Sequence, residues 1–168
     1  MLKSHELIGF MSPALASDIL NFAYETDKPT YKATMNGVAT ALRVRPVYLE
    51  RQPRAQRHIS MVQILSKPGL DAVAGGLIRA WLVQKHKAML IDFLNTLGIQ
   101  NKDGVVDDLP KEIDDAKLKT AVEQLLSKYQ PEVVAVYLNA FNDMNEANWA
   151  NLKAMLEADS RLQLGNHG

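Results

Sequence analysis

The sequence predicts an all-α protein of about seven or eight helices packed as antiparallel helix pairs, with a compact bundle favoured over a short solenoid. Several stretches repeat apolar residues with a helical period, and none sustains the alternation of period two that marks a half-buried strand. Capping residues and prolines stand before many of these stretches. The chain has 168 residues, of which 47% are hydrophobic and 23% are charged, so we expect a single all-helical domain over 1–168.

The N-terminal third predicts two helices that open at Ser12 and Asp27. Each of these residues is a good N-cap, and each is followed within two positions by a proline and then by apolar residues at helical spacing. Further prolines leave room for only a short helical turn over 47–50, before a longer helix over 53–66.

The middle of the chain is apolar at helical spacing over 70–97. This pattern predicts either one long helix or two helices with a bend over 84–87, and Gly98 is placed to end the segment. Residues 101–110 contain Gly104 and end at Pro110, which predicts the best-defined loop of the chain.

Three helices are expected after this loop. The first runs from about Leu118 to Tyr129 behind the acidic pair at 114 and 115, and the second begins at Pro131. The third begins near Trp149, after a break over 143–148.

An asparagine occurs at every third position from 139 to 151. Three residues turn an α-helix by about 300°, so these side chains cannot share one helix face. The simplest interpretation is that Asn145 or Asn148 caps the third helix. The functional alternative is a polar pocket at the junction, for which the candidate residues are Tyr137, Asn145, Asn148 and Trp149.

Charge is unevenly distributed along the chain. Residues 1–90 hold 12 Lys and Arg against 6 Asp and Glu, whereas residues 91–168 hold 7 against 13, which gives about +6 and −6. Much of the positive charge lies in five closely spaced arginines, namely Arg43, Arg45, Arg51, Arg54 and Arg57. The planar guanidinium group binds carboxylates and phosphates bidentately, so these are our candidate partner-binding or phosphate-binding residues.

These observations favour a non-catalytic protein-interaction or self-associating module, which would bind a protein partner or a second copy of itself. Whether the arginines pair with acidic groups of the same subunit remains open at this point. The alternative is a nucleic-acid-binding protein that uses the arginine-rich stretch 43–57.

Enzymatic interpretations have little support in the sequence. There is no cysteine, and none of the four histidines belongs to a zincin, di-iron or triad motif, so no metal site and no cofactor is expected. An enzyme that uses Asp107, Asp108 and His86 is the least favoured hypothesis. No signal peptide and no membrane span is recognisable, so a cytoplasmic location is expected.

Overall fold

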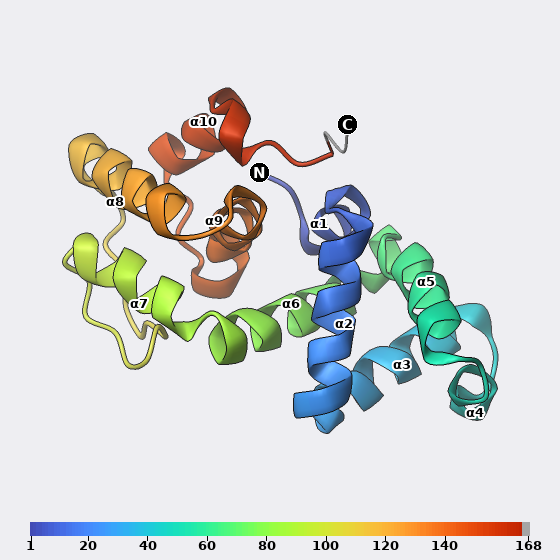
Figure 1. The fold of residues 1–168 in the computed structure, drawn as a ribbon. Helices are drawn as coiled ribbons and strands as arrows, with labels where there is room; N and C mark the ends of the chain where they lie inside the picture. The colour runs from blue at the N-terminus through green and yellow to red at the C-terminus, as the bar shows by residue number, and fades with distance from the viewer. Residues whose placement is uncertain (166–168) are drawn as a thin grey trace. The chain divides into compact units, whose positions relative to one another are not determined.

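The computed structural model describes residues 1–165, and over this range it contains ten α-helices, two short 3₁₀ helices and no β-strand (Figure 1). The all-α prediction is therefore confirmed, with more helices than the seven or eight expected. The described residues fall into two compact units, residues 2–81 and residues 82–165, which we call the N-terminal unit and the C-terminal unit. The single domain over 1–168 and the compact bundle stay predictions.

The N-terminal unit contains seven helical segments. They are α1 (Ser4–Phe10), α2 (Pro13–Thr26), α3 (Lys28–Leu42), α4 (Pro46–Glu50), α5 (Arg54–Leu65), the 3₁₀ helix η1 (Pro68–Leu70) and most of α6 (Asp71–Lys85). The expected N-caps are present: the Ser12 hydroxyl accepts a hydrogen bond from the Leu15 N–H at 3.2 Å, and the Asp27 carboxylate accepts one from the Thr30 N–H at 3.2 Å. Helix α5 packs against α1, α2 and α3, and its buried residues are His58, Met61 and Leu65.

Helix α1 was not expected from the sequence. It buries Leu7 and Ile8, and its first turn is bound to the start of α6, because the His5 N–H and Nδ1 both contact the Asp71 Oδ1 atom, at 3.0 and 2.7 Å. The hydrogen bond from the His5 backbone is the main cause that lowers the pKa of Asp71. This short helix is therefore stabilised by tertiary contacts.

The C-terminal unit contains the end of α6 and five further helical segments. They are α7 (Lys87–Thr96), α8 (Asp115–Lys128), α9 (Pro131–Asn145), α10 (Ala150–Ala158) and the 3₁₀ helix η2 (Ser160–Leu162). The apolar stretch 70–97 thus forms two helices, which are separated at His86 inside the predicted bend. Gly98 follows α7 with a φ of 72°, a left-handed conformation suited to a helix end.

Aromatic side chains form the centre of this second unit. Every residue from Val133 to Phe141 in α9 is buried. Phe93 of α7 lies edge-to-face against Tyr137 and Phe141, with ring centroids 5.5 and 5.4 Å apart, and Trp149 lies 5.2 Å from Phe141. This cluster fixes the position of Trp149 at the start of α10.

No helix within residues 1–165 combines the length and the apolar character needed to cross a membrane.

Candidate functional site

The five arginines of the sequence prediction lie on and around α4 and α5. Arg43 ends α3 in the left-handed conformation, with a φ of 57°, and Arg45 immediately precedes α4. Arg51 follows α4, and Arg54 and Arg57 lie in the first turn of α5. The short helix α4 and the two turns that flank it therefore bring the stretch 43–57 together at one end of the N-terminal unit.

Two of these arginines are used inside the unit. Arg54 stacks over the Tyr24 ring, 4.7 Å from its centroid, and its Nη1 atom lies 3.6 Å from the Glu25 carboxylate. Arg57 donates a hydrogen bond from Nη1 to the Tyr31 hydroxyl at 2.9 Å. Both side chains therefore help to hold α5 against α2 and α3.

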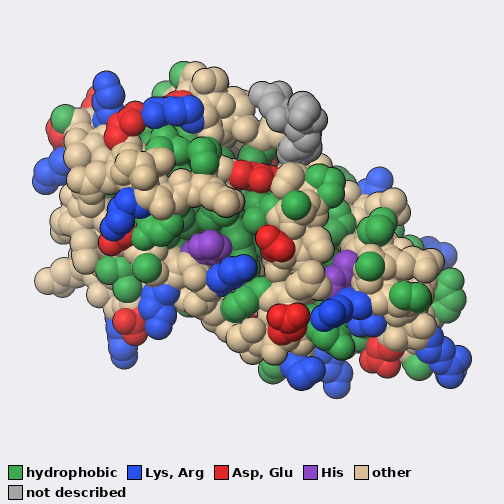
Figure 2. Space-filling view, in the orientation of Figure 1, with side chains coloured by type: hydrophobic (Ala, Val, Ile, Leu, Met, Phe, Trp, Pro, Cys, Tyr) green, Lys and Arg blue, Asp and Glu red, His purple; other side chains and the backbone are tan. Residues whose placement is uncertain are grey.

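The other three arginines are exposed. Across residues 1–165, Arg43, Arg45 and Arg51 form no salt bridge and no side-chain hydrogen bond. Between them, Val47 and Tyr48 of α4 are 43% and 57% exposed. We call Arg43, Arg45, Val47, Tyr48 and Arg51 together the arginine surface. Figure 2 shows hydrophobic and basic side chains gathered together over this end of the unit, at the right of the view.

A second feature lies beside it on α5. An apolar groove of about 360 Å³ is formed by α1, α2 and α5, and none of its lining residues is Asp, Glu, Lys or Arg. Ile8 comes from α1, Ala16 from α2, and Ala55, Ile59 and Val62 from α5. Sequence analysis did not find this groove, because its walls are about forty residues apart in the chain.

His58 is the ionisable residue of the groove. It is 3% exposed, and its Nε2 atom lies 2.9 Å from the Tyr31 hydroxyl. The Tyr31 oxygen already accepts the hydrogen bond from Arg57. We therefore assign the Tyr31 hydroxyl as the donor and His58 Nε2 as the acceptor of the hydrogen bond between these two side chains. Burial, together with the charges of Arg57 and Arg54, lowers the pKa of His58 to about 4, which keeps this imidazole neutral at pH 7.

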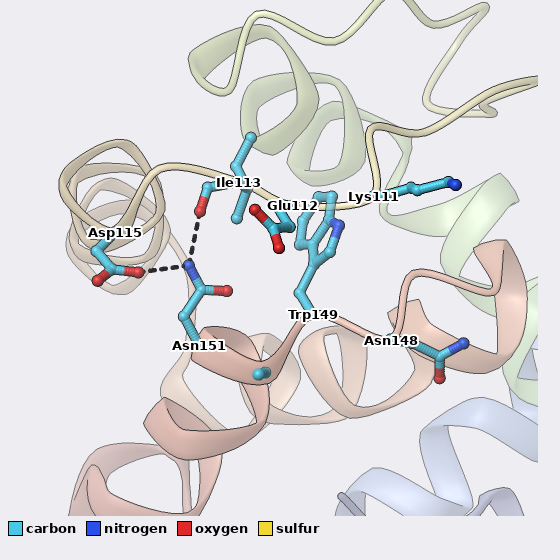
Figure 3. A pocket seen from close by; sticks show the side chains of 8 residues that line it. Lys111, Glu112, Ile113, Asp115, Asn148, Trp149 and Asn151 are labelled. Atoms are coloured by element: carbon cyan, nitrogen blue, oxygen red, sulfur yellow. Dashed lines mark hydrogen bonds between the residues drawn. The ribbon is translucent and has the colours of Figure 1, made fainter.

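A third feature is a pocket of about 320 Å³ in the C-terminal unit, lined by Asn148 and Trp149 among others (Figure 3). The Trp149 ring is 2% exposed and donates its indole N–H to the Pro110 carbonyl at 2.9 Å. Neither of the other two residues proposed for a polar pocket is part of its lining, because Tyr137 is 1% exposed in the core and Asn145 donates to the Phe141 carbonyl at 3.2 Å. Burial also raises the pKa of Tyr137.

The asparagines of this junction are largely used for structure. Asn151 donates to the Ile113 carbonyl at 2.8 Å and to the Asp115 carboxylate at 2.7 Å, as the dashed lines of Figure 3 show. The prediction that Asn145 or Asn148 caps α10 is wrong: the N-cap is Trp149, and no side chain caps the helix. The helix break itself is present, because α9 ends at Asn145 and α10 begins at Ala150.

The residues of the enzyme hypothesis lie on two different segments of the C-terminal unit. Asp107 and Asp108 are exposed on the loop before α8, and His86 lies between α6 and α7, where burial lowers its pKa. Within the described part of the chain, no three His, Asp or Glu side chains are grouped so that they could hold a metal ion.

The chain matches no protein-family model, no curated protein and no solved structure.

Proposed function

We propose that this protein is a non-catalytic interaction module whose arginine surface binds an acidic surface of a protein partner. The observation that carries the proposal is that Arg43, Arg45 and Arg51 are exposed without an acidic partner in residues 1–165, beside the exposed Val47 and Tyr48. Arginine and tyrosine supply much of the binding energy in protein interfaces, and guanidinium groups recognise carboxylates bidentately. A cationic surface with apolar centres suits a partner that is acidic and partly apolar.

Self-association is the narrower form of this proposal. The N-terminal unit carries 10 Lys and Arg against 6 Asp and Glu over residues 2–81, and residues 82–165 carry 9 against 13, so opposite charges of two copies could attract. However, all five exposed large hydrophobic side chains of residues 1–165 belong to the N-terminal unit, namely Phe10, Leu42, Val47, Tyr48 and Ile59. The acidic unit of a second copy offers none to meet them, which favours a different protein as the partner.

The proposal is tested with poly-glutamate as an acidic polypeptide probe. We expect the full chain to bind it at low salt, and the variant Arg43→Ser/Arg45→Ser/Arg51→Ser to lose most of that binding. The control is a variant with the same loss of charge elsewhere on the N-terminal unit, in which the exposed residues Lys32, Lys67 and Arg79 are changed to serine. Equal losses in the two variants would show that only net charge matters and would contradict the proposal.

Light scattering at low and high salt tests the self-associating form. A mass of one copy under both conditions rules out association driven by charge.

Nucleic-acid binding is the second candidate, because the Tyr48 ring is 57% exposed among the three arginines and is available to stack on a base. The check is a fluorescence titration with a short single-stranded oligonucleotide. Binding that weakens steeply as salt rises would favour this candidate, whereas no binding at low salt would remove it.

A further inference from the structure

We infer that the apolar groove between α1, α2 and α5 is a docking site for one amphipathic helix of an acidic protein partner. This inference rests on the proposed function, since it gives the same partner a second, apolar contact beside the arginine surface.

The dimensions of the groove suit two turns of a helix. Its lining positions on α5 run from Ala55 to Gln63, which corresponds to about 12 Å along the helix axis, and its volume is about 360 Å³. Side chains at positions i and i+4 of a partner helix are separated by about 6 Å along its axis, so two apolar anchors fit within that length. Ile59 at the groove is 63% exposed, and an occupant would remove this side chain from water.

The charges beside the groove select an acidic occupant. Arg54 precedes Ala55 and lies four residues before His58, so its side chain is on the same side of α5 as the groove. Its contact with Glu25 is long, at 3.6 Å, and both side chains are largely exposed, so this pair contributes little stability. A carboxylate of the partner can therefore replace Glu25 beside Arg54, and Arg51 of the arginine surface lies only three residues before Arg54 in the chain.

His58, which lines the groove, is compatible with apolar side chains of the partner helix above it. His58 is held by the Tyr31 hydroxyl at 2.9 Å, and because Nε2 accepts that hydrogen bond, Nδ1 carries the proton of the neutral ring. Nδ1 is thus the nitrogen left for an acceptor of the occupant, and no net charge lies beneath the anchors.

The test is a selection of 16-residue peptides from a random display library against the full chain at low salt, followed by fluorescence anisotropy of the selected peptides. We expect peptides with apolar residues four positions apart and with acidic residues around them. Ala55→Trp, which fills the groove from an exposed position on α5, should weaken their binding about tenfold or more, as expected when a buried anchor is excluded. The matched control Ala33→Trp, an exposed alanine of α3 outside the groove, should leave binding unchanged.

The possible outcomes separate the two proposals. If Ala55→Trp binds as the wild type does while the triple arginine variant loses binding, the groove inference is wrong and the proposed function stands. If Ala55→Trp loses binding but the selected peptides are not acidic and the arginine variant binds normally, the proposed function is wrong and an acidic occupant is excluded. A selection that yields no binding peptide overturns the groove inference. Circular dichroism of each variant serves as the control that the chain is still folded.

Discussion

Lowering the pH from 6.5 to 4 should destabilise the protein through His58. In the unfolded chain this residue takes up a proton near its ordinary pKa of 6.5, whereas burial and the neighbouring Arg57 and Arg54 lower its pKa in the folded protein to about 4. Between these two values the unfolded state binds more protons than the folded state, so the free energy of unfolding falls as the pH falls. At about 1.4 kcal/mol per pKa unit, the stabilisation that His58 provides above pH 6.5 and loses by pH 4 is about 3 kcal/mol.

Urea denaturation between pH 7 and pH 4, followed by circular dichroism, measures this loss in the wild type and in His58→Gln. The glutamine carbonyl can still accept the hydrogen bond from the Tyr31 hydroxyl, but it does not titrate. Carboxylates such as Asp71 are common to both proteins, so their effect cancels in the difference. We expect the wild type to lose about 3 kcal/mol more than the variant. Parallel pH profiles would refute the assignment of His58 as a buried neutral histidine.

Three further substitutions test the C-terminal unit by urea denaturation. Gly104 has a φ of 84°, and an added Cβ would lie 2.7 Å from the Leu90 Cβ, so Gly104→Ala should lower the free energy of unfolding by roughly 3 kcal/mol. Its control is Gly98→Ala, at a φ of 72° with no atom within 4 Å of the added Cβ, which should lower the free energy of unfolding by roughly 1 kcal/mol. Equal losses in the two variants would contradict the close contact with Leu90. Trp149→Phe removes the hydrogen bond to the Pro110 carbonyl and part of a buried ring, and should cost about 2 kcal/mol. It should also speed amide exchange in the loop before α8, and an unchanged exchange rate there would show that the indole does not anchor this loop.

The helix starts could be predicted because the signals that set them are local. Ser12, Asp27 and Asp114 each accept a hydrogen bond from an N–H three residues ahead, and Pro131 has the fixed φ that a first helical position requires. The start of α10 was also predicted, near Trp149, but its N-cap residue was not, for the opposite reason. Trp149 occupies the N-cap because its ring is held by the aromatic core and by Pro110, which no local pattern reveals.

The candidate sites depended on contacts that are distant in the sequence. The five arginines look equivalent in the sequence, yet Arg57 binds Tyr31, 26 residues away, while Arg43 has no such partner within residues 1–165. His58 could be seen as a residue near the arginines, but its buried environment depends on α3, and the groove requires α1 and α2 as well. Burial and pairing of this kind follow from the tertiary fold and not from the periodicity of one segment.

The arrangement of charge and apolar surface distinguishes the two candidate functions by their response to salt. A single-stranded nucleic-acid backbone that met Arg43, Arg45 and Arg51 would form about three phosphate contacts, and its binding constant would fall with a slope of roughly −2 in a double-logarithmic plot against salt concentration. A peptide whose apolar residues fill the groove beside Ile59 keeps that part of its binding energy at high salt, because apolar burial is not screened. An affinity that levels off as the salt concentration rises therefore indicates a protein partner. An affinity that continues to fall with the slope expected for three phosphate contacts indicates a nucleic acid.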